Sequence, residues 1–306
     1  MVYRKKKIPT GISCFFFVGG CLLTVVFAYF IRNWRILQLA YTAPTLLFLA
    51  LSWSIPESAR WLLSKGRVEE AKNILHKASM ENGVVLPRDA LDELLTMESG
   101  NKANSGKSSL LDILRYPNIR KRSLILATIW FLNKFAYYGL LWNTVNLAGS
   151  IYVNSGIAAI VDIPGIVFSM LTVDKCRRKV ILGGTMILSS ISLLSTTLVP
   201  TDMTWLVTGL AMVGKSTILV TYSILYIFTS EQYPTTVRNI AVGTASAIAR
   251  LGGVVAPMII KLSKISPLLP LFISGCSMMF AVLLLLLLPE TLKKKLPETI
   301  DEVEEF

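Results

Sequence analysis

The sequence has 306 residues, of which 53% are hydrophobic and only 16% are charged, whereas soluble domains carry about 25% charged residues. Its net charge of +12 would suggest nucleic-acid binding in a soluble protein, but the lysines and arginines lie in short segments between long apolar runs. This pattern excludes an ordinary soluble protein and predicts a protein embedded in the lipid bilayer, with no nucleic-acid partner.

A transmembrane helix needs about 20 predominantly apolar residues. Eight runs reach roughly that length, at residues 11–31, 35–55, 123–146, 149–173, 180–199, 203–228, 238–262 and 267–288. The first run follows a basic segment, as in a signal peptide, but it is too long for one and the second run follows at once. We therefore predict an all-α membrane protein with eight crossings and no cleavage of the first run.

The distribution of basic residues predicts the orientation in the membrane. Of the 31 lysines and arginines, 24 lie in residues 1–10, 56–122, 174–179, 229–238 and 289–306. The loops that alternate with these segments contain few basic residues. Because lysine and arginine are enriched in cytoplasmic loops, both termini and the long loop are expected in the cytoplasm.

The long cytoplasmic loop contains helix signals of its own. After the serine, proline and glutamate in residues 54–57, apolar residues recur about every 3.6 positions from Arg67 to Ser79. Two further short helices are predicted at 87–97 and 109–116, separated by a polar linker. The loop is thus expected to form a small amphipathic bundle beneath the membrane domain.

A short motif occurs twice and suggests an internal repeat. Pro56-Glu57-Ser58 follows the second run, and Pro289-Glu290-Thr291 follows the eighth, so six runs separate two similar exits. Many transporters consist of two six-helix halves related by an axis along the membrane normal. The predicted parts are the last two helices of an N-terminal half (1–55), the cytoplasmic helical loop (56–122), a six-helix C-terminal half (123–290) and a cytoplasmic tail (291–306).

Arg250 lies near the middle of the apolar run 238–262. An arginine at that depth costs from about 3 kcal/mol to on the order of 10 kcal/mol, so it should face protein or a water-filled cavity. Small residues on both sides, among them Gly243, Gly252 and Gly253, allow neighbouring helices to approach closely. We predict a functional site at Arg250. The alternative is an arginine neutralised by an acidic residue on a neighbouring span.

Two other runs place cations and aromatic rings on one helical face. Lys134, Tyr137, Tyr138 and Leu141 or Trp142 are spaced by three and four residues, and Lys215, Tyr222 and Tyr226 form a second stripe. Together with Arg250 they predict a cavity of cations among aromatic rings. Aromatic walls bind flat organic groups of many shapes, and a desolvated cation selects the charged end of a ligand.

Each of these residues also has a purely structural interpretation. Tyr137 and Tyr138 would then be packed in the core, and Lys134 would extend its ammonium toward the cytoplasmic face. Lys215 would serve helix packing near Glu231.

Four charged residues lie at the predicted cytoplasmic ends of the spans: Asp174, Arg178, Glu231 and Arg238. Charge pairs that break and re-form at such ends would favour one access state over the other, so we predict a gating role. The alternative is surface charge that only sets the topology.

The sequence contains one histidine, and neither a metal-ligand cluster nor a phosphate-binding loop is evident. We therefore predict no catalytic residue, no metal and no cofactor, which excludes an enzyme and an ATP-driven pump.

The ordered motifs resemble those of the organic cation, organic anion and carnitine transporters of the major facilitator superfamily. They are Asn33-Trp34-Arg35, Pro56-Glu-Ser-Ala-Arg-Trp-Leu, Phe135-Ala-Tyr-Tyr-Gly-Leu, Asn146-Leu-Ala-Gly, Asp162-Ile-Pro, Gly214-Lys215, Glu231-Gln-Tyr-Pro-Thr-Thr-Val-Arg-Asn, Ala249-Arg-Leu-Gly and Leu288-Pro-Glu-Thr. The resemblance implies a major facilitator helical bundle with about 8 of its 12 transmembrane helices.

The same resemblance implies which residues contact the substrate: Tyr29, Tyr137, Tyr138, Tyr222, Tyr226 and Arg250. In this family, cation carriers tend to have an acidic residue where Arg250 stands, whereas anion and carnitine carriers tend to have arginine. The lysine that some anion carriers place after Asp-x-Pro is replaced here by Ile166. Anions or zwitterions are therefore favoured, although aromatic rings with Asp162 as counter-charge would also hold a cation.

Two departures from the family pattern concern conformational locks. The family's first four spans and the cytoplasmic motif after its second span are missing, and Arg177 stands in the second-half motif where glycine is usual. The leading hypothesis is a plasma-membrane carrier of small organic ions that works by alternating access, with the missing spans explained by a truncated gene model or isoform. The competing hypothesis is a non-transporting membrane protein that associates with, or interferes with, a full-length relative.

Overall fold

The computed structural model describes residues 7–54, 56–57, 59, 62, 67–83, 115–143, 150–173, 175–200, 203–234, 237–266 and 268–291. Every regular element in these ranges is a helix, which confirms the all-α prediction. The helix expected at 87–97, most of the one expected at 109–116, and Asp174 lie outside the described residues. The chain divides into two units, Ile31–Ser108 and Met1–Phe30 with Ser109–Phe306.

The unit Ile31–Ser108 contains α2 (Trp34–Ser54) and α4 (Val68–Glu81). Pro44 lies inside α2, which nevertheless continues for 21 residues. Helix α4 corresponds to the amphipathic helix predicted at 67–79. Its first turn is held by Arg67, whose guanidinium donates two hydrogen bonds of 2.7 and 2.6 Å to the Glu70 carboxylate.

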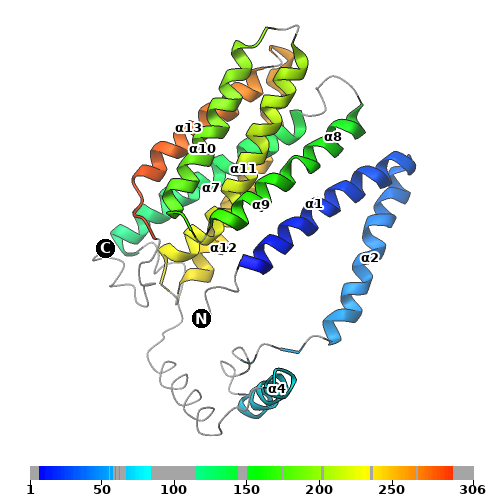
Figure 1. Cartoon of the computed structure of the whole chain (residues 1–306), viewed down its shortest axis with the longest axis vertical. Coiled ribbons are helices and arrows are strands. Elements are labelled where there is room, and N and C mark those ends of the chain that lie inside the picture. The colour runs from blue at the N-terminus through cyan, green and yellow to red at the C-terminus, as the bar shows by residue number, and fades with distance from the viewer. Residues whose placement is uncertain are drawn as a thin grey trace. The chain divides into compact units, whose positions relative to one another are not determined.

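The larger unit contains the other helices of the described residues (Figure 1). They are α1 (Lys7–Phe30), α7 (Pro117–Asn143), α8 (Ile151–Ile160), α9 (Asp162–Thr172), α10 (Arg178–Ser195), η3 (Thr196–Leu198), α11 (Thr204–Gln232), α12 (Arg238–Ile260), η4 (Lys261–Lys264) and α13 (Leu269–Leu286). Helix α1 runs beside α8 and α9, while α7 packs against α11, α12 and α13.

Six helical stretches in the described ranges are long and apolar enough to cross a membrane. They are Pro117–Leu141, Ile151–Thr172, Arg178–Leu198, Thr204–Gln232, Arg238–Lys264 and Leu269–Leu286, and they match the third to eighth predicted runs. The first two runs form α1 and α2, continuous helices of 24 and 21 residues. Their crossing of the membrane stays a prediction.

The run predicted at 149–173 as a single span consists of two helices in line, α8 and α9, which meet at Val161. Pro164 is the third residue of α9 and has no N–H group, so it cannot donate the hydrogen bond that would continue α8 across the junction. Asp162 therefore begins a new helix inside the membrane segment.

Two helices extend beyond the runs predicted from hydropathy. Helix α7 begins at Pro117, six positions before the predicted start at 123, and α11 continues to Gln232, past the predicted end at 228. Hydropathy marks only the apolar part of a helix, and proline is favoured in a first helical turn. Glu231, which the prediction left in a loop, thus lies in the last turn of α11.

Helices α7 and α12 approach closely at the glycines that follow Arg250. A Cβ atom added to Gly252 would lie 2.4 Å from the backbone oxygen of Phe131 and 3.1 Å from the backbone nitrogen of Phe135. A Cβ atom at Gly253 would lie 2.8 Å from the ring of Tyr138. The small residues around Arg250 therefore allow close helix packing, as the sequence predicted.

Replacing Gly252 by alanine is expected to lower stability by about 1 to 3 kcal/mol, because the new methyl group meets backbone that cannot move aside without separating the helices. Gly243→Ala is the matched control on the same helix, since nothing lies within 4 Å of its added Cβ. Alanine there should leave stability unchanged or raise it by up to about 1 kcal/mol. Thermal unfolding in detergent measures both variants, and equal midpoints would contradict the close approach.

Candidate functional site

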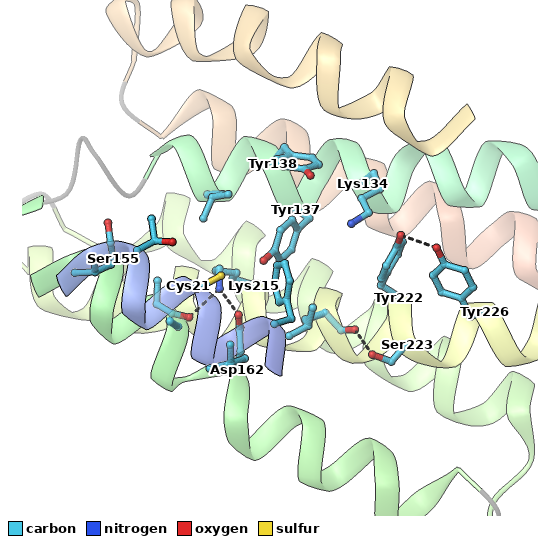
Figure 2. A pocket seen from close by; sticks show the side chains of 18 of the residues that line it. Cys21, Lys134, Tyr137, Tyr138, Ser155, Asp162, Lys215, Tyr222, Ser223 and Tyr226 are labelled. Carbon is cyan, nitrogen blue, oxygen red and sulfur yellow. Dashed lines mark hydrogen bonds and ion pairs between the residues drawn. The ribbon is translucent and has the colours of Figure 1, made fainter. Parts of the chain in front are cut away.

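A cavity of about 1010 Å³ lies between α1, α7, α8, α9 and α11, all in the larger unit (Figure 2). Its size matches that of pockets that enclose drug-sized molecules. The titratable side chains that line it are Cys21, Lys134, Tyr137, Tyr138, Tyr152, Asp162, Lys215, Tyr222 and Tyr226. Most of the rest of the wall is apolar, so the cavity offers a few polar groups on a hydrophobic surface.

A second cavity of about 450 Å³ lies between α7, α11 and α12. It shares Lys134, Tyr138, Tyr222 and Tyr226 with the larger cavity, and α12 adds Ser246 and Arg250. The two cavities therefore meet at one group of side chains. Arg250 and the residues of the two predicted aromatic stripes line one cavity or both. The exception is Trp142, whose side chain is not among those that the structure describes.

Lys134 extends its ammonium into a group of tyrosine rings (Figure 2). The Nζ atom lies 3.7 Å from the ring centroid of Tyr222, 5.3 Å from that of Tyr137 and 5.5 Å from that of Tyr138. These distances are in the range of cation–π attraction. The structural alternative, in which Lys134 reaches toward the cytoplasmic face, is not what the structure shows.

The tyrosines of α11 are held in place by neighbours. The Tyr222 and Tyr226 hydroxyls are 3.1 Å apart, and the Tyr226 hydroxyl lies 3.3 Å from that of Ser246 on α12. Behind them the fully buried Trp130 packs edge-on against both rings, and its Nε1 donates a 2.9 Å hydrogen bond to Thr229. The aromatic wall is thus rigidly supported.

Trp130 did not figure in the sequence prediction. It precedes Lys134 by four residues on α7, so the helical spacing that singled out Lys134, Tyr137 and Tyr138 also extends back to this residue. Continuing the stripe by one turn would have identified it.

Lys215 is neutralised within the structure. Its Nζ lies 2.5 Å from Oδ2 of Asp162 and also donates a 2.8 Å hydrogen bond to the backbone oxygen of Ala158. Lys215 and Asp162 are only 3% and 2% exposed. Lys215 is therefore held by α8 and α9 rather than by residues near Glu231, and Asp162 already has a counter-charge. The other Asp162 oxygen, Oδ1, is buried and accepts no hydrogen bond from any described residue.

Arg250 faces the smaller cavity from α12. No acidic residue forms an ion pair with it in the described part of the chain, so the alternative of a neutralising acid on a neighbouring span finds no support there. Among the described residues, those that line this cavity include two cations, Lys134 and Arg250, and no carboxylate.

Helix α1 supplies a wall of the larger cavity that the sequence analysis did not assign. Its lining residues are Phe17, Val18, Cys21, Thr24, Val25 and Ala28, spaced mostly by three and four. Tyr29 follows this face by one residue, about 100° around the helix, and does not line the cavity. Its ring is 55% exposed and contacts Tyr152, a lining residue, edge-on at 5.6 Å.

At the far end of α10 and α11 the structure pairs two of the four predicted gating residues. The Arg178 Nε forms an ion pair of 3.5 Å with Glu231 Oε2, and that oxygen accepts a 2.7 Å hydrogen bond from the Thr291 hydroxyl. Both charged side chains are largely buried, at 8% and 14% exposure, so they are not simple surface charges. Arg238 instead donates to the backbone oxygen of Tyr233 at 3.2 and 3.1 Å.

Comparison with known proteins gives three kinds of match. Residues 7–303 match the family described as "Sugar (and other) transporter". The sequence is 47% identical to the organic cation transporter protein of Drosophila melanogaster over all of this chain and 57% of that protein. It is 38% identical to the organic cation/carnitine transporter 2 of Homo sapiens over 95% of this chain and 52% of that protein. The chain spans about half the length of these curated relatives.

The solved structure of the major facilitator superfamily proton:xylose symporter XylE, bound to 6-bromo-6-deoxy-D-glucose, covers 97% of this chain with a TM-score of 0.67 and 24% identity. At that identity the likeness concerns the fold alone. This likeness confirms the fold class. The family match and the curated relatives confirm the resemblance of the motifs, and these relatives are transporters and not enzymes.

Proposed function

Because this chain belongs to the sugar (and other) transporter family, we propose that it carries small organic ions across a membrane by alternating access, with a preference for anions or zwitterions. The observation that carries this proposal is that two cations, Lys134 and Arg250, line one cavity whose described lining residues include no carboxylate. At an effective dielectric constant of about 20, a contact between opposite charges is worth about 4 kcal/mol. An anionic group would supply the charge that the wall lacks.

The aromatic wall supports a broad choice of organic bodies. Tyr138, Tyr222 and Tyr226 line both cavities, and rings of this kind gain energy from buried area and stacking rather than from one fixed pattern of hydrogen bonds. The names of the relatives mention organic cations and carnitine. A zwitterion such as carnitine has a carboxylate that suits the Arg250 guanidinium, and this attraction offsets the repulsion between its ammonium and Lys134.

The remaining assignments complete the proposal. Residues 1–55 would supply the last two helices of an N-terminal half and 123–290 the C-terminal half, with 56–122 as the cytoplasmic loop and 291–306 as the tail. The distribution of basic residues supports cytoplasmic termini, and the plasma membrane is the proposed location. The buried Arg178–Glu231 pair supports a gating role, which would also involve Asp174 and Arg238.

Uptake into cells that express the full chain tests this function. A labelled aromatic carboxylate and labelled carnitine should enter at least about tenfold faster than tetraethylammonium, after normalisation to surface protein, since about 1.4 kcal/mol of preference gives that ratio. Uptake equal to that of mock-transfected cells for all three compounds, or faster uptake of tetraethylammonium, would contradict the proposal.

Association with a full-length relative is tested by expressing that relative in the same cells. If the two proteins assemble, the uptake by the relative should change.

A further inference from the structure

Lys134 occupies a space that resembles a binding site for an ammonium ion. Three tyrosine rings from two helices face its Nζ, with the Tyr222 centroid at 3.7 Å and those of Tyr137 and Tyr138 at 5.3 and 5.5 Å. Proteins use aromatic cages of this kind to recognise quaternary ammonium ligands. Here the occupant is a side chain of the protein itself.

The rings are the groups that stabilise this ammonium. In the described residues Lys134 forms no ion pair, and its described contacts are with ring faces. The hydroxyl of Tyr222 is already engaged with that of Tyr226 at 3.1 Å, so the ring face is what Tyr222 offers to a cation. By contrast, the other buried lysine of the cavity, Lys215, is paired with Asp162.

Lys134 also lies where the two cavities meet. It lines the larger cavity together with all three ring partners, and it lines the smaller cavity together with Arg250. A ligand ammonium in either cavity would therefore share that cavity with the Lys134 charge. Two like charges in one cage repel each other, which makes simultaneous occupancy unfavourable.

We propose that the Tyr137–Tyr138–Tyr222 cluster is an ammonium site occupied by the Lys134 side chain, so that Lys134 is the specificity-determining residue that excludes cationic ligands. The inference rests on the proposed function in that it takes the cavity to be the ligand site. It names the substrate class that the site would accept if Lys134 were neutral, namely ligands whose only charge is a quaternary ammonium group. Lys134 thus contributes to charge selection twice, by attracting anions and by filling the cation cage.

Calorimetric titration of the detergent-purified full chain with choline tests this inference without any need for transport. Lys134→Met keeps the length and apolar volume of the side chain but removes its charge, and it is expected to bind choline at least about tenfold more tightly than wild type. The uncharged isostere 3,3-dimethyl-1-butanol should show no comparable gain. Lys134→Arg retains a cation in the cage and should not gain choline affinity.

Two further variants test the rings. In the Lys134→Met background, Tyr222→Phe keeps the ring face and should retain the gain, whereas Tyr222→Leu removes it and should lose most of it. Lys134→Gln provides a second neutral variant if Lys134→Met does not yield folded protein. A folded neutral variant without tighter choline binding, or a gain that survives Tyr222→Leu, would overturn the inference. If the wild-type protein binds no aromatic carboxylate in the same titration, the proposed anion preference is contradicted. That outcome does not affect the comparison of choline binding between the variants.

Discussion

Lys215→Met is expected to destabilise the protein by about 3 to 5 kcal/mol, because it leaves the Asp162 carboxylate buried without its counter-charge. The two atoms of the pair are 2.5 Å apart, and both residues are at most 3% exposed. Water cannot easily compensate the lost partner, and the second carboxylate oxygen accepts no hydrogen bond from the described residues. Chemical unfolding in a mild detergent, together with the amount of protein at the cell surface, measures the effect.

The double variant Asp162→Leu with Lys215→Met provides the decisive comparison. Apolar residues of similar size often replace a buried ion pair with little loss or even a gain of stability, so the double variant should recover most of what either single variant loses. Lys261→Met, at an exposed lysine in η4, is the control for removal of a charge and should be nearly neutral. Additive losses in the double variant would show that the two residues act independently.

Arg250→Asp is expected to abolish binding of an aromatic carboxylate. A contact between opposite charges is worth about 4 kcal/mol at an effective dielectric constant of about 20, so its loss alone weakens binding by about a thousandfold. Arg250→Lys keeps the charge but loses the planar guanidinium that holds a carboxylate with two parallel hydrogen bonds, so a loss of about tenfold is expected. Titration of the purified variants with one carboxylate and one cation gives both affinities.

Lys261→Asp makes the same change of charge outside the cavity and should leave both affinities unchanged. Surface expression of the Arg250 variants should remain near wild type, since no described acidic residue depends on Arg250 for its counter-charge. An unchanged ratio of anion to cation affinity in Arg250→Asp would remove Arg250 from the ligand site. A parallel loss of folding and expression in both Arg250 variants would point to a structural role.

Helical spacing was sufficient to predict that three residues of α7 line one cavity together. Lys134, Tyr137 and Tyr138 lie on a single face of α7, and the structure places that face in the cavity wall. Local sequence determines this arrangement, because residues three and four apart share a face wherever the helix packs. The helical fold and the close helix packing near Arg250 were also predictable, because they too depend on local sequence.

The pairing of Lys215 with Asp162 was not predictable in this way. The two residues are 53 positions apart, and their contact depends on how α11 is placed against the junction of α8 and α9. The hydropathy of residues 149–173 is continuous, so it indicated one span and gave no sign of a new helix at Asp162. Similarly, the face that α1 presents to the cavity depends on tertiary packing, which places Cys21 and Ala28 in the wall and Tyr29 beside it.

The junction at Val161 has a mechanical consequence. Sharp kinks in helices commonly occur at proline, and Pro164 lies near this junction, but neighbouring residues of α11 form hydrogen bonds on both sides of it. Lys215 holds Ala158 and Asp162, and Ser216 donates a 3.0 Å hydrogen bond to the oxygen of Val161. These hydrogen bonds connect α11 to both α8 and α9. They therefore hold the two helices in line and favour their movement as one rigid unit with α11. Bending at Val161 would disturb these bonds, including the buried ion pair, so a rocking movement of the bundle would carry the three helices together.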